Sequence, residues 1–193
     1  MAFHFFAYLS RMRFINRWGL MRNTMPENDM EHAMQCAMIA HGLALIGNTR
    51  YRRQYKPEHV MALALYHDAS EVITGDLPTP IKHNNPAIKA EYKKIEALAS
   101  SRLLSMLPKD IMPAYSELIT PDTSNEEWRL VKAADRLCAY IKCLEEAKAG
   151  NAEFREAQAG IEASVYAIDL PEVQDFIKEF IPGFAMTLDQ ISR

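Results

Sequence analysis

Apolar side chains recur every three or four residues along most of this chain, whereas no stretch alternates cleanly between apolar and polar positions. The first spacing places side chains on one face of an α-helix, and alternation would instead indicate a β-strand. The composition agrees, because 25 alanines stand against only 5 valines and β-branched residues favour strands. The pattern therefore predicts an all-α protein.

The helical pattern is clearest in five segments. They span residues 3–17, 30–46, 57–66, 86–99 and 124–149. The side chains expected on the apolar faces are Phe5, Leu9 and Met12 in the first segment, Met34, Ala37, Met38 and Leu45 in the second, and Ile88, Tyr92, Ile95 and Ala99 in the fourth.

Residue types typical of helix ends place most of the boundaries. Proline suits a first helical position, so helices are expected to begin at Pro57 and, after Asn85, at Pro86. Residues 124–127 have the sequence of a capping box, and Gly150 suits the position just beyond that helix. Asp169 and Pro171 are expected to begin a last helix that Pro182 and Gly183 end, whereas Gly75 to Pro80 is expected to be a structured loop.

Length and composition favour one globular domain over residues 1–193. Apolar residues make up 49% and charged residues 24%, and a chain of this length can bury a core without disulfides. The net charge of −3 argues against a nucleic acid polymer as partner, and no apolar stretch is long enough to cross a membrane. Neither GxGxxG nor a P-loop occurs.

The chain is expected to reside in a reducing compartment. Its three cysteines are scattered and form no Cys-x-x-Cys pair. The first 26 residues hold arginines and no acidic residue, as transit peptides do, but they contain a single serine, whereas transit peptides are serine-rich. We therefore do not expect a transit peptide.

One carboxylate stands where a buried residue is expected. In the segment 124–149 the apolar stripe runs through Trp128, Val131, Cys138 and Ile141, and the same spacing assigns Asp135 to the buried face. Burying an unpaired carboxylate is costly, so Asp135 should meet a metal ion or a cationic side chain, or stay protonated. A salt bridge to a neighbour of Arg136 or to a lysine of another helix is the simple alternative to a metal.

Two further sites place histidine beside carboxylates. His67 and Asp68 directly follow an apolar run, and Glu71 shares their helical face. His32 lies on the apolar side of its own helix. Each residue alone would commonly be structural, but His32, His67, Asp68 and Asp135 together are two imidazoles and two carboxylates. That ligand mixture suits Mn²⁺, Co²⁺, Fe²⁺ or Zn²⁺, with waters completing the shell.

The order H…HD…D resembles the HD-domain superfamily of metal-dependent phosphohydrolases, and the flanking sequences narrow the resemblance. They are residues 15–18, 20–23, 31–32, 66–72, 74–80, 134–135, 137–140 and 142–146. These look like the bacterial 5′-deoxynucleotidases of that superfamily, over nearly the whole chain. The resemblance implies an all-α HD-type helical bundle, cytoplasmic and homodimeric, that hydrolyses 2′-deoxyribonucleoside 5′-monophosphates with broad base tolerance.

The resemblance also implies roles for individual residues. The metal ligands would be His32, His67, Asp68 and Asp135, with Co²⁺, Mn²⁺ or Cu²⁺ as the ion and Zn²⁺, Fe²⁺ or Mg²⁺ as other possibilities. Arg17 would orient the phosphate, Trp18 would select the sugar, and Glu71 would be a catalytic carboxylate. The loop Asp76, Leu77, Pro78 and Thr79 would contact substrate, and Asp76 is the alternative to Glu71 as acid or base.

Two departures and two other functions stay open. Met30 and Ala33 flank Glu31-His32 where serines are expected, and Gly19 stands where proline is expected; these positions bear on rate and affinity more than on reaction type. The alternatives are another HD-type nucleotide phosphohydrolase or phosphodiesterase, or a non-catalytic helical binding module that retains a metal. The intact Glu71 and Asp76 argue against the module.

Overall fold

The computed structural model describes residues 2–78 and 85–192, and every regular element in those ranges is helical. The α-helices are α1 (Phe5–Leu9), α2 (Asp29–Tyr51), α3 (Pro57–Tyr66), α4 (Glu71–Thr74), α6 (Pro86–Leu104), α7 (Met112–Ile119), α8 (Glu126–Lys148), α9 (Arg155–Tyr166), α10 (Pro171–Glu179), α11 (Ile181–Phe184) and α12 (Leu188–Ile191). Two 3₁₀ helices, η1 (Ser10–Phe14) and η2 (Ala152–Phe154), complete them. The predicted all-α class is confirmed.

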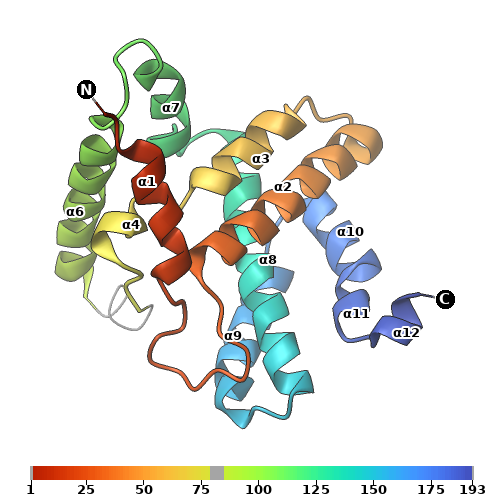
Figure 1. The fold of residues 1–193 in the computed structure, drawn as a ribbon. Helices are drawn as coiled ribbons and strands as arrows, with labels where there is room; N and C mark the ends of the chain where they lie inside the picture. Colours follow the sequence, from red (N-terminus) through yellow and green to blue (C-terminus); the bar gives the residue numbers. More distant parts are fainter. Residues whose placement is uncertain (1, 79–84, 193) are drawn as a thin grey trace.

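Helices α2, α3 and α8 form the centre of the molecule, and the others are arranged around them (Figure 1). The main core cluster joins residues of these three helices to α9, α10 and α11, with Leu43, Leu63 and Leu137 fully enclosed or nearly so. A second cluster lies between α1 and α6 and includes Phe5 and Leu103. No helix of the described residues is both long and apolar enough to cross a membrane.

Several predicted boundaries are confirmed. Helix α3 spans Pro57–Tyr66, as expected, and α6 begins at Pro86, with the Asn85 side chain accepting from the backbone N–H of Ala87. Gly150 follows the C-cap of α8 with φ of 80°, a conformation that glycine adopts without a steric penalty.

Other boundaries differ from the prediction. The predicted helix 3–17 is shorter, because Ile15 is extended and its carbonyl accepts from the backbone N–H of Asp29. Ser124 bonds to Asp122, so Asn125 caps α8 instead. Helix α10 is capped at Leu170 rather than Asp169 and ends at Glu179, whereas Pro182 and Gly183 lie within α11.

The predicted apolar face of α2 is wrong in part. Ala37 is buried, but Met34, Met38 and Leu45 are 54%, 60% and 45% exposed. The reason is that α2 packs against α3, α8 and α10, and the side that meets them carries mostly small residues and His32. Of the large apolar side chains of α2, Ile39 and Leu43 are on the buried side, whereas Met34, Met38 and Leu45 are not. On α6, likewise, Tyr92 and Ala99 are buried while Ile88 and Ile95 are exposed.

A buried ion pair ties the loop between η1 and α2 to the centre of the fold. Lys142 and Glu146, both on α8, bond to each other, and Lys142 also donates to the carbonyl of Met25. The Glu146 carboxylate accepts from the backbone N–H groups of Thr24 and Met25 and from the Asn151 side chain. One turn of α8 thus fixes the loop by bonding to a backbone carbonyl and to backbone N–H groups of the loop.

Replacing Lys142 by methionine is expected to lower the free energy of unfolding by about 3–5 kcal/mol, because the Glu146 charge is then buried without a counter-charge. Urea denaturation measures this. The matched control is Lys94→Met, which breaks an exposed Lys94–Glu91 pair on α6 and should change stability by less than about 0.5 kcal/mol. Equal stability of the two variants would contradict a structural role for the buried pair.

Candidate active site

Four helical elements bring the four predicted ligand residues and Glu71 to one place. His32 lies in the second turn of α2, whose start is fixed by a capping box between Asn28 and Glu31. His67 and Asp68 follow directly on the last residue of α3, and Asp135 lies midway along α8. Glu71 is the first residue of the short helix α4. Because α2, α3 and α8 are mutually packed, these side chains sit on a rigid frame.

The two histidines and two aspartates face one another. His32 Nε2 lies 3.3 Å from Asp135 Oδ1 and 3.7 Å from Asp68 Oδ2. His67 Nε2 lies 3.0 Å from Asp68 Oδ2 and 3.9 Å from Asp135 Oδ1. The ring centroids are 5.3 Å apart, and both histidine side chains are 1% exposed. The structure therefore brings together all four residues that the sequence singled out.

The chemistry of this group fits a divalent cation. His67 Nδ1 donates to the backbone carbonyl of Ala64 at 2.7 Å, which leaves Nε2 as the nitrogen with a lone pair. Among the described residues, neither His32 Nε2 nor His67 Nε2 has a hydrogen-bond partner, although both are buried. Two buried nitrogens that face two carboxylates without bonding to them form a donor set suited to a borderline divalent ion.

Cys36 is a neighbour of this group that the sequence did not single out. Its Sγ and one ring nitrogen each of His32 and His67 lie within 4.8 Å of one another. A hydrogen bond with Cys138 and burial raise the pKa of the Cys36 thiol well above its ordinary value, and its Sγ faces the carbonyl of Val131 at 4.0 Å. Metals bind the thiolate, and a raised pKa keeps Cys36 in its thiol form. We therefore assign Cys36 to the wall of the site and not to the ligands. Its one-turn spacing from His32 was the available signal.

Asp135 makes a salt bridge, which was the simple alternative to a metal, and also faces the two histidines. Its Oδ2 accepts from Lys132 Nζ at 2.6 Å, so a lysine does pair with it, but that lysine is on the same helix. The other oxygen, Oδ1, faces the two histidines. Although burial alone would raise it, the pKa of Asp135 is held well below its ordinary value by His32, His67 and Lys132. The carboxylate is therefore ionised, with one oxygen bonded to Lys132 and the other facing the two histidines.

Two further carboxylates of the cluster, Glu71 and Asp29, have raised pKa values instead. Burial, reinforced by the charges of Asp68, Asp29 and Asp76, raises the pKa of Glu71 to about 9. Asp29 is fully buried, and burial together with Asp68 and Asp76 raises its pKa to about 7 against the opposing charge of Arg17. Asp68, by contrast, has its pKa lowered by His67 despite burial. Carboxylates whose pKa values are driven apart are typical of acid–base sites.

Arg17 lies at the edge of this cluster of charges. Its Nη1 donates to Asp68 Oδ2 at 3.2 Å and lies 3.7 Å from Asp29 Oδ1, and its Nε lies 3.6 Å from Glu27 Oε2. The side chain is 14% exposed. The guanidinium is thus held beside a predicted ligand by three carboxylates, two of which, Glu27 and Asp29, the sequence did not indicate.

Trp18 follows Arg17 in a left-handed backbone conformation, with φ of 58°. Its indole Nε1 donates to Glu27 Oε2 at 3.2 Å, and its ring packs against Phe154 with centroids 5.2 Å apart. The neighbouring Gly19 is exposed, and a β-carbon added there would meet nothing closer than the Asn16 carbonyl at 3.9 Å. Of the other two departures, Met30 is half-buried and Ala33 is buried.

Part of the predicted substrate loop follows α4. Asp76, Leu77 and Pro78 are half-buried, and the charge of Asp76 acts on both Glu71 and Asp29, which places it beside the site. Thr79 lies outside the described residues.

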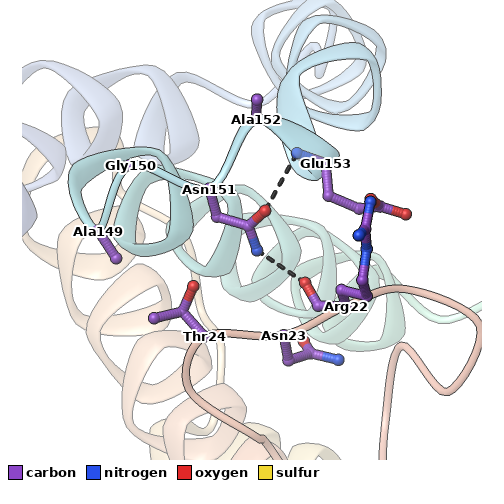
Figure 2. A pocket seen from close by; sticks show the side chains of 8 residues that line it. All are labelled: Arg22, Asn23, Thr24, Ala149, Gly150, Asn151, Ala152 and Glu153. Atoms are coloured by element: carbon purple, nitrogen blue, oxygen red, sulfur yellow. Dashed lines mark hydrogen bonds and ion pairs between the residues drawn. The ribbon is translucent and has the colours of Figure 1, made fainter.

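A polar pocket lies on the far part of the loop that carries Arg17 and Trp18. Figure 2 shows its lining, which comes from residues 22–24 and 149–153. The Asn151 side chain donates to the carbonyl of Arg22 and accepts from the N–H of Glu153 there. None of the predicted site residues lines this pocket.

This chain resembles known proteins in both sequence and fold. A 5′-deoxynucleotidase of Erwinia tasmaniensis is 51% identical over 191 residues, covering 98% of this chain and 96% of that protein. An HD-domain phosphohydrolase of Listeria innocua has a TM-score of 0.82 at 21% identity, covering 98% of this chain and 92% of that one. The HD phosphohydrolase DatZ of cyanophage S-2L, bound to dA and one catalytic Zn²⁺ ion, has a TM-score of 0.64 at 21% identity over 93% of this chain and 95% of its own.

The two solved structures support the fold, and the sequence comparisons are specific to a family. The family model described as 5′-deoxynucleotidase YfbR-like matches residues 4–184. With that match and a relative about half identical over nearly its full length, this chain belongs to the YfbR-like 5′-deoxynucleotidase family.

Proposed function

We propose that this protein is a metal-dependent phosphomonoesterase that hydrolyses 2′-deoxyribonucleoside 5′-monophosphates to the deoxynucleoside and phosphate, with broad base tolerance. The observation that carries the proposal is the pair of buried histidine nitrogens, His32 Nε2 and His67 Nε2, which face Asp68 and Asp135 without a hydrogen bond. Membership in the YfbR-like family supports the substrate class.

His32, His67, Asp68 and Asp135 would hold one divalent ion, with Co²⁺, Mn²⁺ and Cu²⁺ as the expected activators. When bound, such an ion would lower the pKa of a water ligand and offset phosphate charge. Zn²⁺ is also a candidate, because a protein of similar fold, DatZ, is described with a catalytic zinc and dA. The preference among these ions is decided by the activity assay below.

The chain's own residues supply the rest of the reaction. Arg17 would bind two phosphate oxygens through its planar fork, after exchanging its contact with Asp68 for the substrate. Trp18, the next residue, would form a wall against a ribose 2′-hydroxyl. Glu71, with Asp76 as the alternative, would accept a proton from the attacking water or donate one to the leaving oxygen. The loop from Asp76 to Thr79 would contact the nucleotide.

Residues 1–193 would form one catalytic domain, in the cytoplasm, that assembles as a homodimer. The exposed apolar side chains of Met34, Met38 and Leu45 on α2 support self-association, since such groups gain by leaving water. Neither a nucleic acid polymer nor a membrane is proposed as partner.

The direct test is phosphate release from dAMP and from AMP with Co²⁺, Mn²⁺, Cu²⁺, Zn²⁺ or Mg²⁺ as the added ion. We expect faster release from dAMP and none after chelation. Asp135→Ala should lose metal and activity together, whereas the exposed Asp175→Ala, whose carboxylate pairs with Arg50 on α2, should keep both. Release from cyclic or polyphosphorylated nucleotides alone would favour another HD hydrolase, and bound metal without any hydrolysis would favour a binding module.

The raised pKa of Glu71 predicts a pH-dependent stability of the metal-free protein. The folded state holds the Glu71 proton up to about pH 9, whereas an unfolded glutamic acid loses it near pH 4.5. Its contribution to stability is therefore complete below pH 4.5 and is lost as the pH rises towards 9. In EDTA, Glu71→Gln should be more stable than wild type at pH 8, by about 1.4 kcal/mol or more, and the gain should vanish at pH 4.

The measurement is urea unfolding at the two pH values. Glu96→Gln on α6 serves as a control, because it removes a half-buried carboxylate from another helix. The same gain at pH 4 and pH 8 would contradict a raised pKa. With metal added, Glu71→Gln should bind the ion normally and lose most turnover.

Trp18→Ala is expected to raise activity on AMP relative to dAMP, because it removes the wall that meets the 2′-hydroxyl. Apolar walls reject an added hydroxyl only about 10²-fold, so the ratio of kcat/KM values should move by no more than that. The packing of Trp18 on Phe154 means that the variant also loses stability, but a loss of stability lowers both activities together. An unchanged ratio in the folded, metal-loaded variant would remove Trp18 from the substrate site.

A further inference from the structure

We propose that Glu27 is a positioning residue that holds a metal-ligand histidine with one carboxylate oxygen and the substrate-binding pair Arg17–Trp18 with the other. The inference rests on the proposed function for the roles of those partners. It adds a residue that neither the sequence motifs nor the family resemblance indicates, and it assigns that residue a link between the metal centre and the substrate-binding segment.

The two oxygens of Glu27 face different partners. Oε1 lies 3.7 Å from Nδ1 of His32. Oε2 accepts the indole N–H of Trp18 at 3.2 Å and lies 3.6 Å from Nε of Arg17. The Glu27 side chain is 14% exposed.

The backbone places Glu27 opposite Arg17. The N–H of Arg17 donates to the carbonyl of Glu27 at 3.0 Å, and the N–H of Asp29 donates to the carbonyl of Ile15 at the same distance. Asn16 and Asn28 form an isolated antiparallel bridge between these bonds. The segment with Arg17 is therefore paired with the residues that lead into α2, five positions before His32.

The contact with His32 bears on which ring nitrogen carries the hydrogen and which carries the lone pair. A carboxylate beside Nδ1 favours the tautomer with hydrogen on Nδ1, which leaves the lone pair on Nε2, towards Asp68 and Asp135. His67 achieves the same orientation through the Ala64 carbonyl. The two histidines thus have different groups beside Nδ1, a carboxylate oxygen at 3.7 Å for His32 and a hydrogen-bonded backbone carbonyl for His67, and only the first is a replaceable side chain.

The contact with Trp18 holds a backbone conformation that tryptophan rarely adopts. A positive φ is unfavourable for a residue with a bulky side chain, so surrounding contacts must maintain it at Trp18. The bond to Glu27 and the packing on Phe154 are two contacts that hold its indole. Because Arg17 precedes Trp18, this conformation also bears on where the guanidinium lies.

A carboxylate suits this position because both of its oxygens accept hydrogen bonds. A glutamine has one acceptor oxygen and an NH₂ group that cannot accept. Glu27→Gln would therefore keep either His32 or the Arg17–Trp18 pair and lose the other, with the negative charge lost for both.

The first experiment titrates Co²⁺ alone into metal-free protein by calorimetry. Loss of a carboxylate behind a ligating histidine typically weakens metal binding 10–100-fold, and we expect Glu27→Gln to fall in that range. The matched control is Glu153→Gln, which breaks the Arg22–Glu153 ion pair further along the same loop (Figure 2) and should bind Co²⁺ as wild type does. Wild-type affinity in folded Glu27→Gln would overturn the proposal.

The second experiment separates the two oxygens. Trp18→Phe keeps an aromatic ring but lacks the indole N–H, so it should raise KM for dAMP while leaving Co²⁺ affinity unchanged. The KM effects of Trp18→Phe and Glu27→Gln should not add in the double variant, because both remove the same bond. A Trp18→Phe enzyme with wild-type KM, or additive effects, would overturn the link to the substrate pair.

A purely structural role predicts a different result. In that case the melting temperature of metal-free Glu27→Gln would fall and Co²⁺ affinity would recover at low temperature, where the variant is fully folded; that outcome overturns the proposal. If Glu27→Gln does not fold, Trp18→Phe alone still tests the link between Glu27 and the substrate pair.

The failure of the proposed function would give a different result. A wild-type protein that binds Co²⁺ but hydrolyses no deoxynucleotide refutes the proposed function, whereas the Co²⁺ affinity of Glu27→Gln still decides the role of Glu27 towards His32.

Discussion

The constraint on which the rest of this structure depends is the burial of His32 and His67 against Asp68 and Asp135. Two imidazoles at 1% exposure would each need a partner at Nε2, and the described residues provide none with hydrogen-bond geometry. Burying unsatisfied polar groups is costly, and two such nitrogens that face two carboxylates suit a cation that would satisfy them together. The central packing of α2, α3 and α8 brings these residues to that point.

Electrostatics separate this cluster into groups with different tasks. The aspartates that face the histidines have lowered pKa values and are ionised, as a metal would require, whereas burial and the negative charges nearby raise the pKa values of Glu71 and Asp29. A divalent ion would add positive charge to the same space and draw the Glu71 pKa back down, towards the range in which it can exchange a proton with water. In the proposed function, the protonation of Glu71 would therefore be coupled to metal binding through the charge of the cluster.

The sequence predicted the centre of the site better than its surroundings, and the reason is physical. Asp135 interrupts a regular apolar stripe. His67 and Asp68 directly follow an apolar helical run that begins at Pro57, a residue typical of a first helical position. Both signals are local, so they can be recognised without knowledge of the fold. Glu27 and Asp29 give no such signal. They lie on either side of a helix cap in an irregular segment, and their importance comes from the pairing of residues 15–17 with residues 27–29, which no periodicity encodes. The prediction that Met34 and Met38 lie on the buried face was wrong for a related reason, since the side of α2 that meets its three neighbours consists mostly of small residues, which give only a weak apolar pattern.

The segment between η1 and α2 is fixed at two points by different chemistry. Near Thr24 and Met25, the Lys142–Glu146 pair anchors it to α8 through backbone bonds that do not depend on the identity of the loop side chains. Near Arg17 and Trp18, the Glu27 side chain is the link, and its partners are side chains of the site. Gly19 lies between the two anchors at an exposed position, where a β-carbon would make only an ordinary contact, 3.9 Å from the Asn16 carbonyl. A different residue in the middle of the loop would therefore leave the histidine–aspartate cluster in place, because both ends of the loop are held independently.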